Sequence, residues 1–278
     1  MFFRPFAAAV AVSAVLALPR AGLAAADTAA LGEALHLAEV FEVMAEEGRA
    51  YGAELEAEMF PGGGGASWQN AVSGIYSVDR MLPDFNGVFA AELERSGADT
   101  GAILEFFRSD LGQEVTTLEI SARRALLDEG VEEASRLKLD EMRAEGSRRL
   151  ALVEDFVRAN DLVETNVVGA LNANYAFYQG LADADALIGE MTESDMLREV
   201  WTQEDSIREE TDLWIHSYLA MAYTPLSDDD LKAYIEFSRS QAGQDLNRAL
   251  FAGFDAVFVD VSRDLGRAAG AVLAGQDL

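Results

Sequence analysis

The chain has no cysteine among its 278 residues. It therefore cannot form a disulfide, supply a thiolate nucleophile or bind a metal through thiolates. No cysteine follows the apolar N-terminal run either, and this excludes a lipoprotein anchor. Half of the residues are hydrophobic, so the stability of the fold must come from apolar side chains buried in a core.

Basic residues are scarce, and lysine is the scarcest of them. The chain has 21 Lys and Arg against 49 Asp and Glu, a formal net charge of −28, and its lysines are Lys138 and Lys232. Binding to nucleic acid or to an anionic lipid surface needs clustered basic residues. We therefore expect no nucleic-acid partner, and we interpret the acidic surface as a source of solubility.

Long apolar runs are absent beyond the N-terminus. Arg4 precedes an apolar run over residues 6–18, and small residues fill positions 21–26. This pattern predicts an export signal over residues 1–26 and a periplasmic or secreted protein without stable membrane insertion. Arg20 leaves an uncleaved anchor open, although the run is shorter than the ~20 residues that a membrane-spanning helix needs. The candidate cleavage positions are Ala24, Ala25 and Ala26.

Sustained alternation of apolar and polar residues, the pattern of a β-strand, is also missing. Apolar residues instead recur every three or four positions, most clearly over residues 37–59 and 150–178. This spacing places them on one face of a helix. We therefore predict an all-α protein.

Local signals predict where several helices begin and end. Pro61 and the glycines 62–65 close the first long helix, Ser67 caps the next, and Pro83 opens a third. Thr192 and Asp195 resemble a capping box, which predicts one helix from there to about residue 218.

One segment of the sequence occurs twice. Residues 105–114 return as residues 236–245, with identical Glu, Phe, Arg, Ser, Gly and Gln positions, and helical apolar patterns continue on both sides. We predict a helical bundle built from two tandem, pseudo-symmetric units, residues 27–145 and 146–278. The motif comprises Glu105, Phe106, Arg108, Ser109, Gly112 and Gln113 in the first copy and Glu236, Phe237, Arg239, Ser240, Gly243 and Gln244 in the second.

We interpret this motif as structural. Its serine can cap a new helix, and its glycine lets a neighbouring helix approach closely. The Glu and Arg lie three residues apart, so they can pair across one helix face. We expect Phe106 and Phe237 to be buried. The charged stretch 128–149 is the predicted junction between the units.

The second copy resembles a secreted bacterial family known as domain of unknown function 2059. The resemblance rests on the acidic start after Ser227, on Phe237, and on the Ser240 to Gln244 step into a second apolar helix. It covers residues 222–278, and a diverged copy lies around residues 99–128. The resemblance implies an all-helical exported protein and carries over no catalytic residue.

The two histidines are the candidates for metal chemistry. Glu33 and His36 have the Glu-x-x-His spacing of di-metal bundles, but such a site needs a second copy, and Leu213 stands three residues before His216. Asp212 and His216 lie one helical turn apart, so a metal bridging the two halves is conceivable. We favour two helix-surface histidines without a metal or cofactor.

No hydrolase motif is present. The chain has no Gly-x-Ser-x-Gly elbow, and no histidine lies near a candidate nucleophilic serine. We therefore predict a non-enzymatic binding or protein-interaction module whose partner is a protein or a small apolar ligand. The alternative is a hydrolase or metal-binding enzyme that combines carboxylates with His36 or His216.

Overall fold

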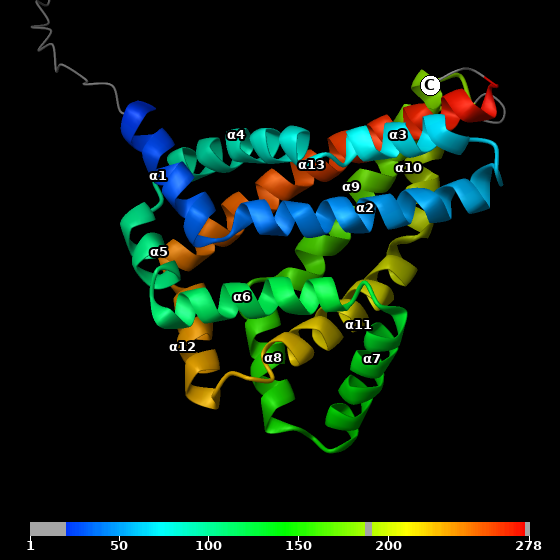
Figure 1. The fold of residues 1–278 in the computed structure, drawn as a ribbon. Helices are drawn as coiled ribbons and strands as arrows, with labels where there is room; N and C mark the ends of the chain where they lie inside the picture. Colours follow the sequence, from blue (N-terminus) through cyan, green and yellow to red (C-terminus); the bar gives the residue numbers. More distant parts are fainter. Residues whose placement is uncertain (1–20, 187–190, 276–278) are drawn as a thin grey trace, which may run out of the picture.

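A computed structural model describes residues 21–186 and 191–275. Its regular structure there is helical and contains no strand, so the all-α prediction is confirmed. Figure 1 shows long helices in the upper part of the molecule and shorter ones below them. Most of the predicted export signal lies outside the described residues, and the first helix begins at Ala21.

The helices fall into two runs along the chain. The first run is α1 Ala21–Ala34, α2 Leu37–Met59, α3 Gly65–Ile75, α4 Val78–Ser96, α5 Thr100–Phe107, α6 Asp110–Ala125 and α7 Glu129–Ala144. The second run is α8 Arg148–Ala159, α9 Leu162–Asp183, α10 Glu193–Thr202, α11 Glu204–Ala222, α12 Asp228–Arg239 and α13 Gln241–Leu273.

Short polar side chains cap many of these helices. Thr192 and Asp195 form the capping box at the start of α10 that the sequence predicts. Ser227 accepts a hydrogen bond from the backbone of Asp230 at the start of α12. At the other end of a helix, Gly97 stops α4 in the left-handed region, with φ of 66°.

Several predicted boundaries are wrong. Ser67 lies inside α3, which begins earlier because the backbone N–H of Trp68 already bonds Gly64, and the Trp68 ring is buried. Pro83 lies inside α4 rather than at its start. A proline in a helix removes one hydrogen bond. Here the buried stripe of Met81, Phe85, Phe89 and Leu93 stabilises the helix across that gap.

The long helices predicted in the second half are each broken once. The helix over residues 150–178 divides into α8 and α9 at Asp161, whose φ is 51°. The helix from Thr192 to residue 218 divides into α10 and α11 at Gln203. These breaks redirect the chain, so that α9 can pack along α13 and α10 can pack against α9.

One continuous core spans both predicted units. The longest helix, α13, packs against α9 of its own half and against α4 of the other. Figure 1 shows α13 running between these helices. Phe254 on α13 contacts the rings of Phe41 and Phe85 from the first half. The packing at Gly180 and Gly266 leaves no room for a Cβ, because α9 and α13 touch through their backbones there.

Most of the charged stretch 128–149, the predicted junction, lies in α7. Its apolar residues Leu139 and Met142 are buried on α7, whereas Leu137 is exposed. The helix packs against α11 of the second half. Across residues 21–186 and 191–275, no helix combines the length and the apolar character needed to cross a bilayer.

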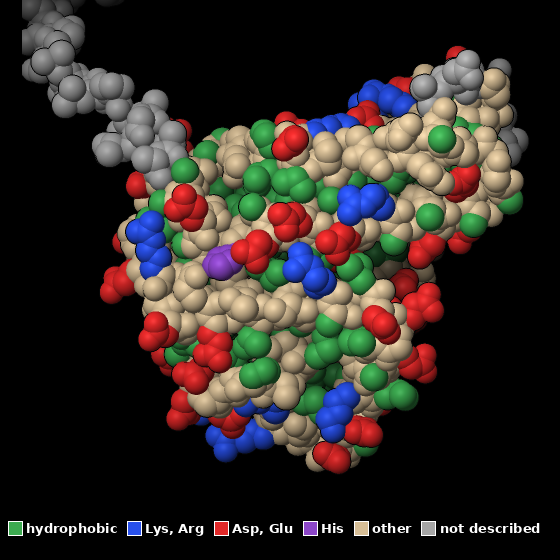
Figure 2. Space-filling model, viewed as in Figure 1, with side chains coloured by type: hydrophobic (Ala, Val, Ile, Leu, Met, Phe, Trp, Pro, Cys, Tyr) green, Lys and Arg blue, Asp and Glu red, His purple; other side chains and the backbone are tan. Residues whose placement is uncertain are grey.

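Acidic side chains are spread over the face seen in Figure 2 without forming one dense region. Figure 2 shows Asp and Glu spread across the visible face, with Lys and Arg interspersed singly or in small groups. This distribution agrees with the large negative net charge of the chain. It gives the visible face no extended basic patch of the kind that contacts phosphates.

Candidate functional site

The two copies of the sequence motif adopt the same local geometry. Ser109 accepts a hydrogen bond from the backbone of Gly112 at the start of α6, and Ser240 accepts one from Gly243 at the start of α13, both at 3.1 Å. Each glycine lies against the end of the preceding helix, where a Cβ would overlap a backbone carbonyl oxygen. The glycine therefore permits a sharp corner between two consecutive helices.

The motif glutamine of each copy hydrogen-bonds across its own helix corner and to the end of a more distant helix. The side-chain amide of Gln113 donates to the carbonyl oxygens of Phe107 at 2.6 Å and Ala34 at 3.0 Å. The amide of Gln244 donates in the same way to Ser238 at 2.6 Å and Ala159 at 2.9 Å. Ala34 is the last residue of α1 and Ala159 is the last residue of α8. Each of these helices ends just before a left-handed residue, His36 or Asp161.

The motif phenylalanines are not buried as predicted. Phe106 and Phe237 are both half-buried and stack on one another, with ring centroids 4.0 Å apart and an interplanar angle of 11°. The fully buried position in the first copy belongs to the next residue, Phe107. The prediction failed because the spacing alone did not show that the two copies meet each other.

The Glu and Arg positions of the motif do not form the predicted pairs. Glu105, Arg108, Glu236 and Arg239 are all exposed, and no ion pair joins them within either copy. Arg239 instead binds Asp155 on α8 at 2.6 Å.

Glu33 and His36 do not have the arrangement that the Glu-x-x-His spacing predicts. Glu33 lies on α1, whereas His36 is the left-handed residue between α1 and α2, so the pair does not share a helix face. Nδ1 of His36 lies 3.0 Å from Glu39, and Nε2 lies 2.9 Å from the side-chain oxygen of Gln113. Both neighbours are acceptors. The bond to Gln113 and the nearby Glu39 raise the pKa of His36 against the opposing effect of burial.

Asp212 and His216 do form a pair on α11. Nδ1 of His216 lies 2.8 Å from the carbonyl oxygen of Asp212 and 3.2 Å from its carboxylate. His216 is 9% exposed, which corrects the expectation of a surface histidine. The described residues contain no group of three or more potential metal ligands, so Glu33, His36, Asp212 and His216 do not converge on one centre.

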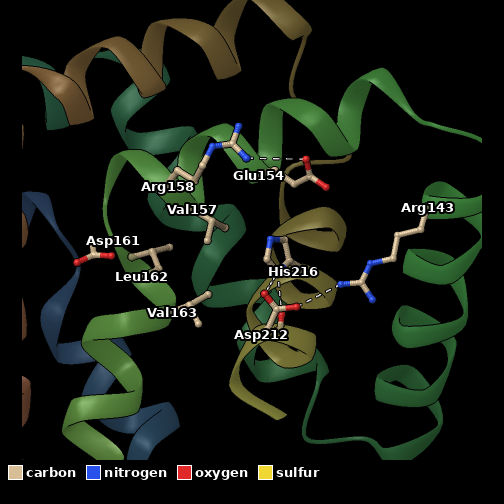
Figure 3. A pocket seen from close by; sticks show the side chains of 9 residues that line it. All are labelled: Arg143, Glu154, Val157, Arg158, Asp161, Leu162, Val163, Asp212 and His216. Atoms are coloured by element: carbon tan, nitrogen blue, oxygen red, sulfur yellow. Dashed lines mark hydrogen bonds and ion pairs between the residues drawn. The ribbon is translucent and has the colours of Figure 1, made fainter. Parts of the chain in front are cut away.

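A pocket of about 480 Å³ opens beside His216. Figure 3 shows the imidazole near its middle, with apolar side chains on one side and arginines at the edges. The lining comes from α7, α8, the start of α9 and α11, so both predicted units contribute. The lining residues are Arg143, Glu154, Val157, Arg158, Asp161, Leu162, Val163, Asp212 and His216.

The acceptors at Nδ1 of His216 determine which ring nitrogen is free. Because both acceptors near Nδ1 belong to Asp212, the neutral ring carries its proton on Nδ1 and keeps a lone pair on Nε2. No hydrogen bond to Nε2 is present within the described part of the chain. The pocket therefore contains a nearly buried imidazole with one unpartnered nitrogen.

A second pocket, of about 370 Å³, lies between α7 and α11. Apolar residues of both helices form much of its wall, including Val131, Ala134, Ala220 and Met221. The hydroxyls of Ser135 and Ser217 already donate to carbonyls of their own helices. This pocket therefore has less polar chemistry to offer than the His216 pocket.

A half-buried carboxylate on α6, that of Glu119, was not identified from the sequence. Glu119 accepts hydrogen bonds from the hydroxyls of Tyr223 at 2.6 Å and Tyr234 at 3.2 Å, and both tyrosines are buried. Burial raises the pKa of Glu119, and these hydrogen bonds oppose the rise. Its partners lie more than a hundred residues away, so no local signal could reveal the cluster. The cluster joins α6 to α12 and to the end of α11, and its residues line neither of the two pockets.

Comparison of the chain with protein-family models, with curated proteins and with solved structures finds no match.

Proposed function

We propose that the protein binds a small molecule in the His216 pocket and does not act as an enzyme. The observation that carries the proposal is His216 itself, which is nearly buried and leaves Nε2 without a partner beside open space. A ligand with a hydrogen-bond donor could bind to this free acceptor nitrogen. The volume lies within the ~300–1,000 Å³ of ordinary ligand pockets.

The composition of the wall supports binding rather than covalent catalysis. Val157, Leu162 and Val163 offer an apolar surface, while a few charged groups surround it. None of the nine lining residues is a serine, threonine or cysteine. A hydrolase mechanism with a serine, threonine or cysteine nucleophile would therefore lack that nucleophile among these residues.

Direct activation of water is the second candidate function. The Asp212 and His216 geometry favours it, because a histidine whose Nδ1 is held by acceptors has Nε2 free to act as a general base. Ester hydrolysis by purified protein that disappears in His216→Gln would support this function. Equal hydrolysis by both proteins would exclude it.

We further propose that the chain is exported after loss of residues 1–26, that it is related to the family of domain of unknown function 2059, and that residues 27–145 and 146–278 are pseudo-symmetric units. The matching hydrogen bonds of the two motif copies support the last point. N-terminal sequencing of protein from the periplasm checks the first. Recovery of Met1 would contradict it.

A pair of tryptophan variants on one helix tests the binding site. Val163 lines the pocket, and Val168 is 48% exposed on the same helix outside it. Ligand-observed NMR with a library of small fragments should detect binders to the native protein. Val163→Trp should abolish that binding because the indole fills the pocket, while Val168→Trp should leave it intact.

Thermal melts of both variants show whether they remain folded. Fragments that bind the folded Val163→Trp protein as well as they bind the native protein would place the binding site elsewhere. Absence of any fragment binding to the native protein would reject the proposed function.

A further inference from the structure

Carboxylates outnumber arginines in the lining of the His216 pocket. The charged residues of the lining are Glu154, Asp161 and Asp212 against Arg143 and Arg158. The whole chain carries a formal net charge of −28. An anion that enters this space therefore meets a negative potential, whereas a cation is attracted to it.

Two of these carboxylates accept no hydrogen bond from the described part of the chain. The nearest cation to Glu154 is Arg158 at 4.0 Å, which is longer than a hydrogen bond. The side chain of Asp161 makes no capping hydrogen bond, and Figure 3 shows its carboxylate directed away from His216. Asp161 therefore only adds negative charge to the pocket, whereas Glu154 also keeps free acceptor oxygens.

The two arginines do not reverse this balance. The side chain of Arg143 is 42% exposed and that of Arg158 is 66% exposed. Figure 3 shows both at the edges of the pocket. Guanidinium groups with this exposure remain hydrated, so water and salt screen their charge.

His216 supplies an observation that is independent of these charges. It is nearly buried, and its Nε2 is a free acceptor because Asp212 holds the proton on Nδ1. Figure 3 shows Glu154 and Val157 on the side of the ring away from Asp212, where a donor to Nε2 would lie. The lone pair on Nε2 accepts from an N–H or O–H group and repels a carboxylate. A charged donor makes the stronger hydrogen bond of the two kinds.

We propose that the ligand of the His216 pocket is a primary amine with an apolar body. Its ammonium group donates a hydrogen bond to Nε2 of His216 and is attracted by the carboxylate of Glu154. Its apolar body packs on Val157, Leu162 and Val163. This inference rests on the proposed binding function and assigns its ligand class.

Three ligands with the same apolar chain separate charge from hydrogen bonding. Hexylamine, hexanol and hexanoate are titrated into the purified protein by calorimetry near neutral pH. Hexylamine should bind about tenfold more tightly than hexanol, because a charged donor makes a stronger hydrogen bond than a neutral one. Hexanoate has no donor and should bind most weakly.

The scarcity of histidine allows the contact with Nε2 to be observed directly. The chain has two histidines, so protein with isotope-labelled histidine gives imidazole NMR signals from His36 and His216 alone. Hexylamine should shift the Nε2 signal of His216. The signals of His36 should not move, since His36 lies between α1 and α2 and does not line the pocket.

A pair of glutamine variants tests the effect of charge. Glu154→Gln should weaken hexylamine binding about three- to fivefold, the magnitude of a partly exposed ion pair, and leave hexanol binding unchanged. Glu199→Gln is the matched control, since Glu199 is exposed on α10 outside the pocket and its loss changes the net charge by the same amount. It should change neither affinity.

Other results overturn the assignment in distinguishable ways. Equal binding of amine and alcohol, tightest binding of hexanoate, an unmoved Nε2 signal of His216, or an unchanged hexylamine affinity in folded Glu154→Gln would each reject an amine ligand. If none of the three compounds binds while library fragments still lose their binding in Val163→Trp, the ligand class is wrong and the binding function stands. If no fragment binds either, both proposals fail.

Discussion

Replacement of Gly243 by alanine tests whether the helix corner depends on the missing side chain. A Cβ at this position would overlap the carbonyl oxygen of Phe237 and lie 2.8 Å from the Cα of Ser238. Both neighbours are backbone atoms, so no side-chain rotation can relieve the overlap. The two helices must move apart, and the hydrogen bonds of Ser240 and Gln244 across the corner must lengthen.

The expected cost follows from two opposed effects. Overpacking of a tight contact costs about 1–3 kcal/mol. Alanine is favoured over glycine in a helix interior by up to about 1 kcal/mol, and less near the first turn where Gly243 lies. We therefore expect a net loss of about 1–2 kcal/mol in the free energy of unfolding. Gly112→Ala should lose a similar amount because its contacts to Phe106 and Phe107 match.

Urea unfolding followed by circular dichroism measures these changes. Gly87→Ala is the matched control, since Gly87 lies within α4 and a Cβ there would meet no atom within 4 Å. It should gain up to about 1 kcal/mol. A Gly243→Ala protein as stable as the native one would show that the close approach is not required, and the structural interpretation of the motif would be wrong.

Further predictions concern a half-buried carboxylate, an aromatic stack and two ion pairs. Folding raises the pKa of Glu119, so native stability should fall as the pH rises from the ordinary glutamate value through the folded pKa. Glu119→Gln should abolish this loss of stability with rising pH. The variant should therefore melt at a higher temperature than the native protein near pH 8 but not near pH 5, and an equal destabilisation at both pH values would refute the prediction. A double-mutant cycle of Phe106→Leu and Phe237→Leu should give a coupling of about 0.5–1.5 kcal/mol from urea unfolding, because the rings stack; additive effects would contradict that. Glu47→Ala should cost about 1–2 kcal/mol, since it leaves the partly buried Arg123 without its bidentate partner. Glu92→Ala, which removes a pair with the exposed Arg95 on the same helix, should cost less by the same measurement.

The helical class and many helix ends were accessible from the sequence because their causes are local. Apolar spacing over residues 37–59 predicts α2 with its observed bounds, and Thr192 and Asp195 predict the cap of α10. The sequence did not predict the helix breaks at which a residue other than glycine adopts a left-handed conformation. Asp161 adopts φ of 51° between α8 and α9, and although Asp visits this region more often than most residues, its type alone does not predict a break at this position.

The candidate site depended on tertiary structure even more strongly. The spacing of Asp212 and His216 showed that they share a helix face, but it could not show that α7, α8 and α9 enclose that face. Likewise, the repeated motif identified Phe106 and Phe237 as equivalent positions, yet only the fold brings the two rings together. Periodicity and capping act within a few residues, and the sequence displays them directly. Burial, pKa shifts and pockets arise where distant segments meet, so they were decided by the tertiary packing of the helices.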